Sequence, residues 1–161
     1  MGPRSAGGPG HLVQWLIAEH HSSAMPEDPN APIMAAFAQW NAALATLNAT
    51  TVAALYAPSA VLIPARSNKV SNTRAEIEEY FVTFLKSKPQ GVIDTIAGSS
   101  PNIRFLASDV AVNTGTYTFA LTNAETGVVS EAHARFTYVY KKYGDSWLIE
   151  DHHSSLMPEP L

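Results

Sequence analysis

The segment Trp147–Ser155 near the end of the chain combines apolar, acidic and histidine side chains in a pattern that could support acid–base chemistry. If this segment is a strand with a regular period of two, Asp151 and His153 share a face with Trp147, on the inward side of the sheet. They would then point toward the mouth of the fold, about 7 Å apart along the strand. Burial moves the pKa values of both side chains toward neutrality, which favours proton transfer. Two other interpretations stay open: a hydrogen-bonded network across a subunit boundary, and passive binding of a small ligand.

Two more side chains could contact a ligand, whereas a metal site is not expected. Arg135 lies on a strand-like segment whose facing is ambiguous, so its guanidinium either holds a carboxylate inside the fold or lies at a surface or interface. Tyr117, on the preceding strand-like segment, is a candidate contact for the same ligand, together with His153. The adjacent His152 and His153 face opposite ways on a strand and cannot bind one ion, so we expect no metal and no other cofactor.

One fifteen-residue motif occurs twice. Gln14–Asp28 (QWLIAEHHSSAMPED) and Ser146–Pro160 (SWLIEDHHSSLMPEP) are identical at ten of fifteen positions. The first copy lies between a Gly/Pro-rich leader and the Pro-rich joint Pro26–Pro32. We interpret it as a mobile mimic of the last strand, which pairs with an exposed sheet edge or crosses to a neighbouring subunit. A duplication without a role and a shared signal to an outside partner are the alternatives. The interface candidates in the two copies are Trp15, Ile17, His20, His21, Trp147, Glu150 and His152.

The elements that must position these residues begin with helices. Apolar residues between positions 32 and 47 recur at spacings of three and four, which predicts one amphipathic helix, with Asn30 as its cap. A short helix is expected over Thr51–Tyr56. Thr73 followed by Glu76 is typical of reciprocal capping at a helix start. Strands are predicted over Leu12–Glu19, Ala60–Ile63, Val92–Ile96 joined with Asn102–Phe105, Asp109–Thr122, Val129–Lys142 and Trp147–Ser155.

Helices followed by long antiparallel strands predict an α+β fold in which a curved, cone-like sheet wraps around the N-terminal helices. We divide the chain into a flexible extension, residues 1–31, and a cone domain, residues 32–161. The 10 basic and 14 acidic residues form no basic patch, so a nucleic-acid partner is not expected. The chain has no apolar run long enough to span a membrane and no cysteine, and we expect a cytoplasmic protein.

Three stretches carry a resemblance to a known family. They are the opening helix with Trp40-Asn41 followed by Thr51–Tyr56, the stretch Pro101–Leu106 before Ala111-Val112, and the ending Gly144–Ser155. The layout resembles the nuclear transport factor 2-like cone fold, which includes ketosteroid isomerase and the SnoaL-like polyketide cyclases. Within that fold, residues 32–158 are similar to the association (hub) domain of calcium/calmodulin-dependent protein kinase II.

The resemblance implies a non-catalytic, self-assembling hub that forms a two-layer homo-oligomeric ring of more than ten subunits. A kinase or an extended peptide strand is a further candidate partner. The chain departs from the kinases because it has no kinase domain, and because Ser154 and Ser155 follow the histidine where the kinase hub has an arginine. The alternatives are a small cone-fold enzyme, of cyclase or isomerase type, that uses Asp151 and His153, and a small carboxylate-binding module that uses the cone cavity.

Overall fold

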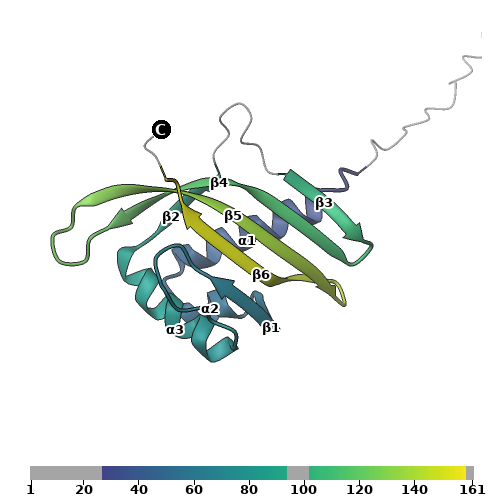
Figure 1. Ribbon diagram of the computed structural model, residues 1–161, viewed down its shortest axis with the longest axis horizontal. Coiled ribbons are helices and arrows are strands. Elements are labelled where there is room, and N and C mark those ends of the chain that lie inside the picture. The colour runs from purple at the N-terminus through teal and green to yellow at the C-terminus, as the bar shows by residue number, and fades with distance from the viewer. Residues whose placement is uncertain (1–26, 94–101, 159–161) are drawn as a thin grey trace, which may run out of the picture.

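Helices cover one face of a curved six-stranded sheet (Figure 1) in the computed structural model, which describes residues 27–93 and 102–158. The elements are α1 (Ala31–Ala45), α2 (Ala49–Ala53), β1 (Tyr56–Ile63), α3 (Arg74–Phe84) with the 3₁₀ turn Leu85–Ser87, β2 (Gln90–Ile93), β3 (Asn102–Ala107), β4 (Val110–Thr122), β5 (Val129–Tyr143) and β6 (Ser146–Leu156). The α+β cone expected from the sequence is confirmed.

Local sequence explains where the helices start. Thr73 accepts a hydrogen bond on its hydroxyl from the Glu76 amide at 3.2 Å, and the Glu76 carboxylate accepts one from the Asn72 amide at 3.1 Å. These two bonds satisfy amides that have no partner inside the helix. Asn48 caps α2 in a similar way, by accepting from the Thr51 amide at 3.1 Å. The prediction of an Asn30 side-chain cap on α1 is wrong, because that residue has helical backbone angles and makes no such bond.

The sheet order is β1-β6-β5-β4-β2, and β3 pairs with the remaining length of β4. All pairings are antiparallel except that β1 runs parallel to β6. The sequence predicted that 92–96 and 102–105 form one strand. The structure instead has two strands, because the thirteen residues of β4 accept β2 over Tyr117–Ala120 and β3 over Val110–Thr114. The other residues of that predicted strand, 94–96, lie outside the described residues.

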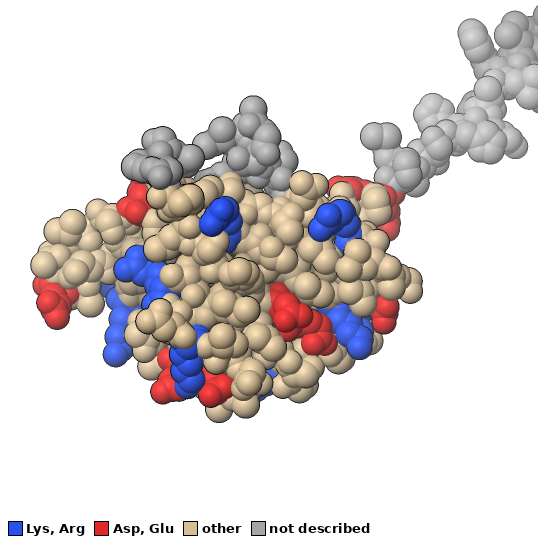
Figure 2. Space-filling view, viewed as in Figure 1, with Lys and Arg blue, Asp and Glu red and all other residues tan. Residues whose placement is uncertain are grey.

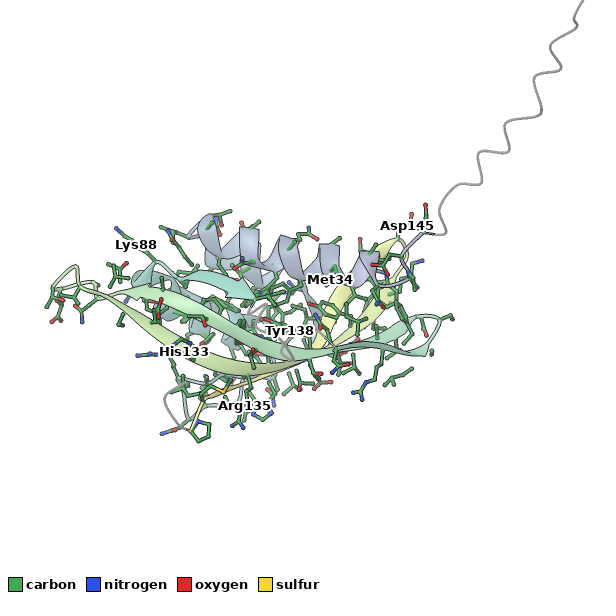
Figure 3. The ribbon with its side chains drawn as sticks, turned by 90° about the horizontal axis from the view of Figure 1, so that it is seen from above. Met34, Lys88, His133, Arg135, Tyr138 and Asp145 are labelled. Atoms are coloured by element: carbon green, nitrogen blue, oxygen red, sulfur yellow. The ribbon has the colours of Figure 1, made fainter. Side chains whose placement is uncertain are left out.

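The concave face of the sheet holds the core. On β4 the buried side chains Tyr117, Phe119 and Leu121 alternate with Thr118, Ala120 and Thr122, which point the other way, so the two-residue period that the sequence predicted is present. Tyr138 lies between the sheet and α1, whereas His133 and Arg135 lie on the side of the sheet away from that helix (Figure 3). The α1 residues that face the sheet are Ile33, Phe37, Trp40, Ala43 and Leu44.

A β-bulge in β6 decides which side chains enter the cone. Ile149 pairs with Tyr140, but Asp151 pairs with Val139, so Glu150 is an extra residue. Its carboxylate accepts hydrogen bonds from the hydroxyls of Ser59 on β1 and Tyr143 on β5. Beyond the bulge the alternation of side chains is reversed.

The reversal corrects a prediction about the site. His152 and Ser154 are buried, at 4% and 9% exposure, whereas Asp151 and His153 are exposed on the opposite face. The prediction that Asp151 and His153 point into the cone is wrong, because it assumed an uninterrupted period of two.

Among the described residues, no helix is long and apolar enough to cross a membrane. The predicted strand Leu12–Glu19 and the interface candidates Trp15, Ile17, His20 and His21 lie outside the described residues.

Replacing Thr73 by alanine removes the cap of α3, and we expect the free energy of unfolding to fall by about 1 kcal/mol in urea titrations. Thr83, which is exposed on the same helix, supplies the control. T83A should stay within about 0.5 kcal/mol of the wild type. Equal effects of the two substitutions would show that the cap does not stabilise the helix.

Candidate functional site

A row of hydrogen-bonded side chains crosses the interior of the cone, and we call it the polar chain: Trp40, Tyr56, His152, Tyr117 and Ser154. The Trp40 indole N–H donates to the Tyr56 hydroxyl oxygen at 3.1 Å. The Tyr56 oxygen lies 2.8 Å from Nδ1 of His152, and Nε2 of His152 lies 3.4 Å from the Tyr117 oxygen. Tyr117 donates to Oγ of Ser154 at 2.7 Å. The polar chain therefore joins α1, β1, β6 and β4.

The donors fix the tautomer of His152. The Tyr117 hydroxyl donates to Ser154, so its oxygen accepts from Nε2 of His152, and Nδ1 is left to accept a hydrogen bond from Tyr56, whose oxygen accepts from the Trp40 indole. The imidazole proton is then on Nε2, which donates to Tyr117. The Tyr117 hydroxyl in turn donates a hydrogen bond to Oγ of Ser154, so the hydroxyl hydrogen of Ser154 is the free donor at the end of the polar chain.

Burial controls the charges of these groups. Desolvation, together with the smaller effect of the nearby His153, lowers the pKa of His152 to about 3, so the imidazole is neutral near pH 7. Desolvation also raises the pKa values of Tyr56 and Tyr117 above their ordinary range. The polar chain thus offers fixed dipoles and one hydroxyl donor rather than a group that exchanges protons at neutral pH.

The polar chain borders a small cavity. The cavity has a volume of about 40 Å³, which is room for a few waters or a small molecule. His152 and Ser154 supply its polar wall, and the exposed Arg66 also borders it. The phenol of Tyr80 lies in the same wall, and desolvation raises its pKa to about 12. Aromatic side chains from the helices and β4 make up much of the remainder: Trp40, Phe81, Phe84 and Phe119.

The sequence-predicted site residues are divided between the two faces of the sheet. Tyr117 lines the cavity, as a candidate ligand contact should. Arg135 is exposed on the opposite face, so the interpretation of this residue as a cavity arginine is wrong. Asp151 and His153 lie on that outer face as well. The buried polar or charged side chains among the described residues are Ser71, Asn113, His152 and Ser154, so no carboxylate is available inside for general acid–base work.

The interior also contains polar atoms without protein partners. The amide of Asn113 and the hydroxyls of Tyr138 and Tyr140 are buried and have no hydrogen-bond partner among the described residues. Asn113 and Tyr138 are directly opposite on β4 and β5. A buried polar group left unpaired costs about 1–3 kcal/mol, so this part of the cone is not optimised for stability.

Sequence reasoning missed three members of the polar chain. Trp40 and Tyr56 lie in segments for which the sequence predicts helices, and Ser154 alternates with the residues expected to point inward. The duplicated His-His-Ser-Ser motif distinguishes this stretch from the rest of the chain, but only the strand pairing around Glu150 shows which of its residues point inward.

The curved sheet, its helices and the enclosed cavity define a cone of the nuclear transport factor 2-like class. A ketosteroid isomerase-like protein from Erwinia carotovora aligns over 83% of this chain and 99% of its own, with 19% identity and a TM-score of 0.67. A superfamily member from Salmonella enterica aligns over 81% and 92%, with 17% identity and a TM-score of 0.68. At these identities the likeness concerns the fold alone.

Within this class, the chain belongs to the calcium/calmodulin dependent protein kinase II association domain family, whose sequence model matches residues 30–158. A Xanthomonas campestris protein assigned to that association domain has 49% identity and a TM-score of 0.75, and the alignment covers 86% of this chain and 95% of that one. Comparison with curated protein sequences gives no match. The family expected from the sequence is therefore confirmed.

The lowered pKa of His152 makes stability depend on pH. The unfolded chain binds a proton at this residue below its ordinary pKa of 6.5, whereas the folded chain does not bind one until about pH 3. The free energy of unfolding should therefore fall, by up to about 1.4 kcal/mol per pH unit, as pH falls from 6.5 toward 3, and this contribution is constant above that window. In urea titrations from pH 7 to 4.5, H152Q should show a flatter dependence than the wild type.

H153Q is the matched control, because His153 is the exposed neighbour on the same strand. It should keep the wild-type slope. An unchanged slope in H152Q would contradict the buried, neutral state of His152.

Proposed function

We propose that this chain is a self-assembling hub that forms a two-layer ring of more than ten copies, in the cytoplasm. Its N-terminal segment adds a strand to a sheet edge or subunit interface. Membership of the association domain family supports self-assembly. A kinase or an extended peptide would then be held on the ring as a second kind of partner.

The observation that carries the proposal is the outer, convex face of the sheet. Directly opposite residues on neighbouring strands share this face, and no described helix covers it. Figure 2, viewed from the same side as Figure 1, shows a mostly uncharged surface over these strands with isolated charges. We define the convex face by Val61, Ile63, Arg104, Val112, Thr114, Thr116, Thr118, His133, Arg135, Thr137, Val139, Asp151, His153 and Ser155.

The chemistry of the convex face suits contact with protein better than contact with water. Its members include five threonine or serine residues and four valine or isoleucine residues, and Arg135 and Asp151 are among its charged side chains. Depletion of charge with retention of β-branched side chains is typical of the centre of a protein interface. Threonine hydroxyls also let two such faces exchange hydrogen bonds across a contact.

The cavity supports a second, subordinate role. An aromatic wall with one fixed hydroxyl donor suits passive binding of a small, mainly apolar molecule. Catalysis of cyclase or isomerase type lacks support, because Asp151 and His153 face away from the cavity. A carboxylate ligand likewise lacks the Arg135 contact that the sequence suggested.

A charge placed on the convex face should disrupt assembly. We expect T137E to shift the main species in native mass spectrometry from a ring to monomers or dimers, because an unpaired buried charge weakens an interface by about 2 kcal/mol or more, at least 30-fold. T83E places the same charge on the exposed side of α3 and should assemble as the wild type does. A T137E ring of unchanged size would show that assembly uses another surface.

Removal of the N-terminal segment should also alter the assembly. Deleting residues 1–26 keeps the Asp28 carbonyl and carboxylate, which accept from the amides of Ala31 and Asn30 next to α1. We expect the deletion to change the subunit number or to lower the melting temperature, both measured on the purified assembly. An unchanged ring with unchanged stability would remove the proposed role of the segment.

A further inference from the structure

The duplicated motif preserves the buried part of β6. Inside the described range of β6, three residues are buried: Ile149, His152 and Ser154. Their equivalents in the first copy are Ile17, His20 and Ser22, which are identical in type. The partly buried Trp147 and Leu148 are also repeated, as Trp15 and Leu16. Every β6 side chain that packs against the core or joins the polar chain is therefore present twice.

The differences between the copies avoid the buried positions. Within β6 they fall at Ser146, Asp151 and Leu156, which are exposed, and at the bulge residue Glu150. The first copy has Gln14, Glu19, Ala24 and Ala18 at these positions. The single-residue spacing through the bulge is also retained, so Ile17 and His20 have the separation that places Ile149 and His152 on the same face. A surface signal for an outside partner has no need of this pattern.

We infer that residues 14–25 are a second β6, which inserts between β1 and β5 of another copy of this chain. The inference rests on the proposed function and makes it specific. The segment takes the place of an interior strand instead of extending a free edge. In that position Ile17 packs in the core, and His20 accepts a hydrogen bond from the Tyr56 hydroxyl. The partner is a second copy of the chain, and the docking site is the position that its own β6 occupies.

The short joint before α1 excludes insertion into the chain's own sheet. A residue at the Ser146 end of β6 lies near the start of α1, because Pro32 and Ser146 border the same surface groove. Met25, the equivalent of Met157, would lie at the other end, roughly 30–35 Å away for eleven residue steps along a strand. The six steps from Met25 to Ala31 span at most about 22 Å. Insertion in the orientation of β6 is therefore possible only between chains.

The first copy is a weaker strand than β6 itself. Ala18 cannot accept the hydrogen bonds that the Glu150 carboxylate receives from Ser59 and Tyr143. Ala24 also buries less apolar surface than Leu156. The native strand therefore occupies its own position in a settled subunit, and exchange takes place when β6 is displaced, as subunits join or leave an assembly.

Cross-linking can test this register, because the chain contains no cysteine. His153 lies opposite Thr137, so the inference places His21 of one chain opposite Thr137 of another. We would co-produce H21C and T137C chains, oxidise them, and identify linked peptides by mass spectrometry. We expect a 21–137 link between chains at several times the yield of a 22–137 link from S22C with T137C, since residue 22 would face the core. A chain carrying both T137C and H153C is the positive control for the geometry.

The outcomes separate this inference from the proposed function. With the positive control linked, equal yields at positions 21 and 22, or no 21–137 link, would overturn the inference. A 21–137 link confined to single chains in an H21C/T137C double variant would overturn it as well. Native mass spectrometry of the wild type is read independently: a ring without the link overturns the inference alone, whereas a monomer overturns the proposed function.

Discussion

The imidazole of His152 is held at both nitrogens by tyrosine hydroxyls, from Tyr56 on β1 and Tyr117 on β4. These strands are not neighbours in the sheet, so the two contacts close the curved sheet across its interior. The imidazole also stacks on Tyr138 of β5, with ring centroids 4.1 Å apart. Four strands and α1 therefore meet at one neutral side chain, and the interior of the cone depends on His152 remaining uncharged.

Most of the architecture could be predicted because it follows from local patterns in the sequence. The α1 stripe, the Thr73–Glu76 cap and the alternation along β4 each depend on residues a few positions apart, and the structure has all three. The candidate site could not be predicted in the same way. The facing of β6 depends on Glu150, whose extra position is stabilised by Ser59, some ninety residues earlier, and by Tyr143 on the neighbouring strand. No local pattern carries that information.

The same bulge separates two kinds of chemistry that the sequence places side by side. His152 and Ser154 belong to a buried interior with one hydroxyl donor, and Asp151 and His153 belong to the convex face. This division fits the association domain family to which the chain belongs, because the candidate acid–base pair does not reach the cavity. A cone enzyme of acid–base type needs an ionisable group within reach of its cavity, and burial shifts the pKa values of His152, Tyr80 and Tyr117 in that wall away from neutral pH.

The cavity and the convex face lie on opposite sides of one sheet. A molecule entering from the concave side would meet α3 and the end of β6, and it would not compete sterically with a neighbour packed on the outer strands. In the proposed assembly through the convex face, substitutions in the interior would leave the contact surface unchanged, and substitutions on that surface would leave the cavity unchanged. A domain divided in this way offers two features, the cavity wall and the convex face, that can be engineered independently.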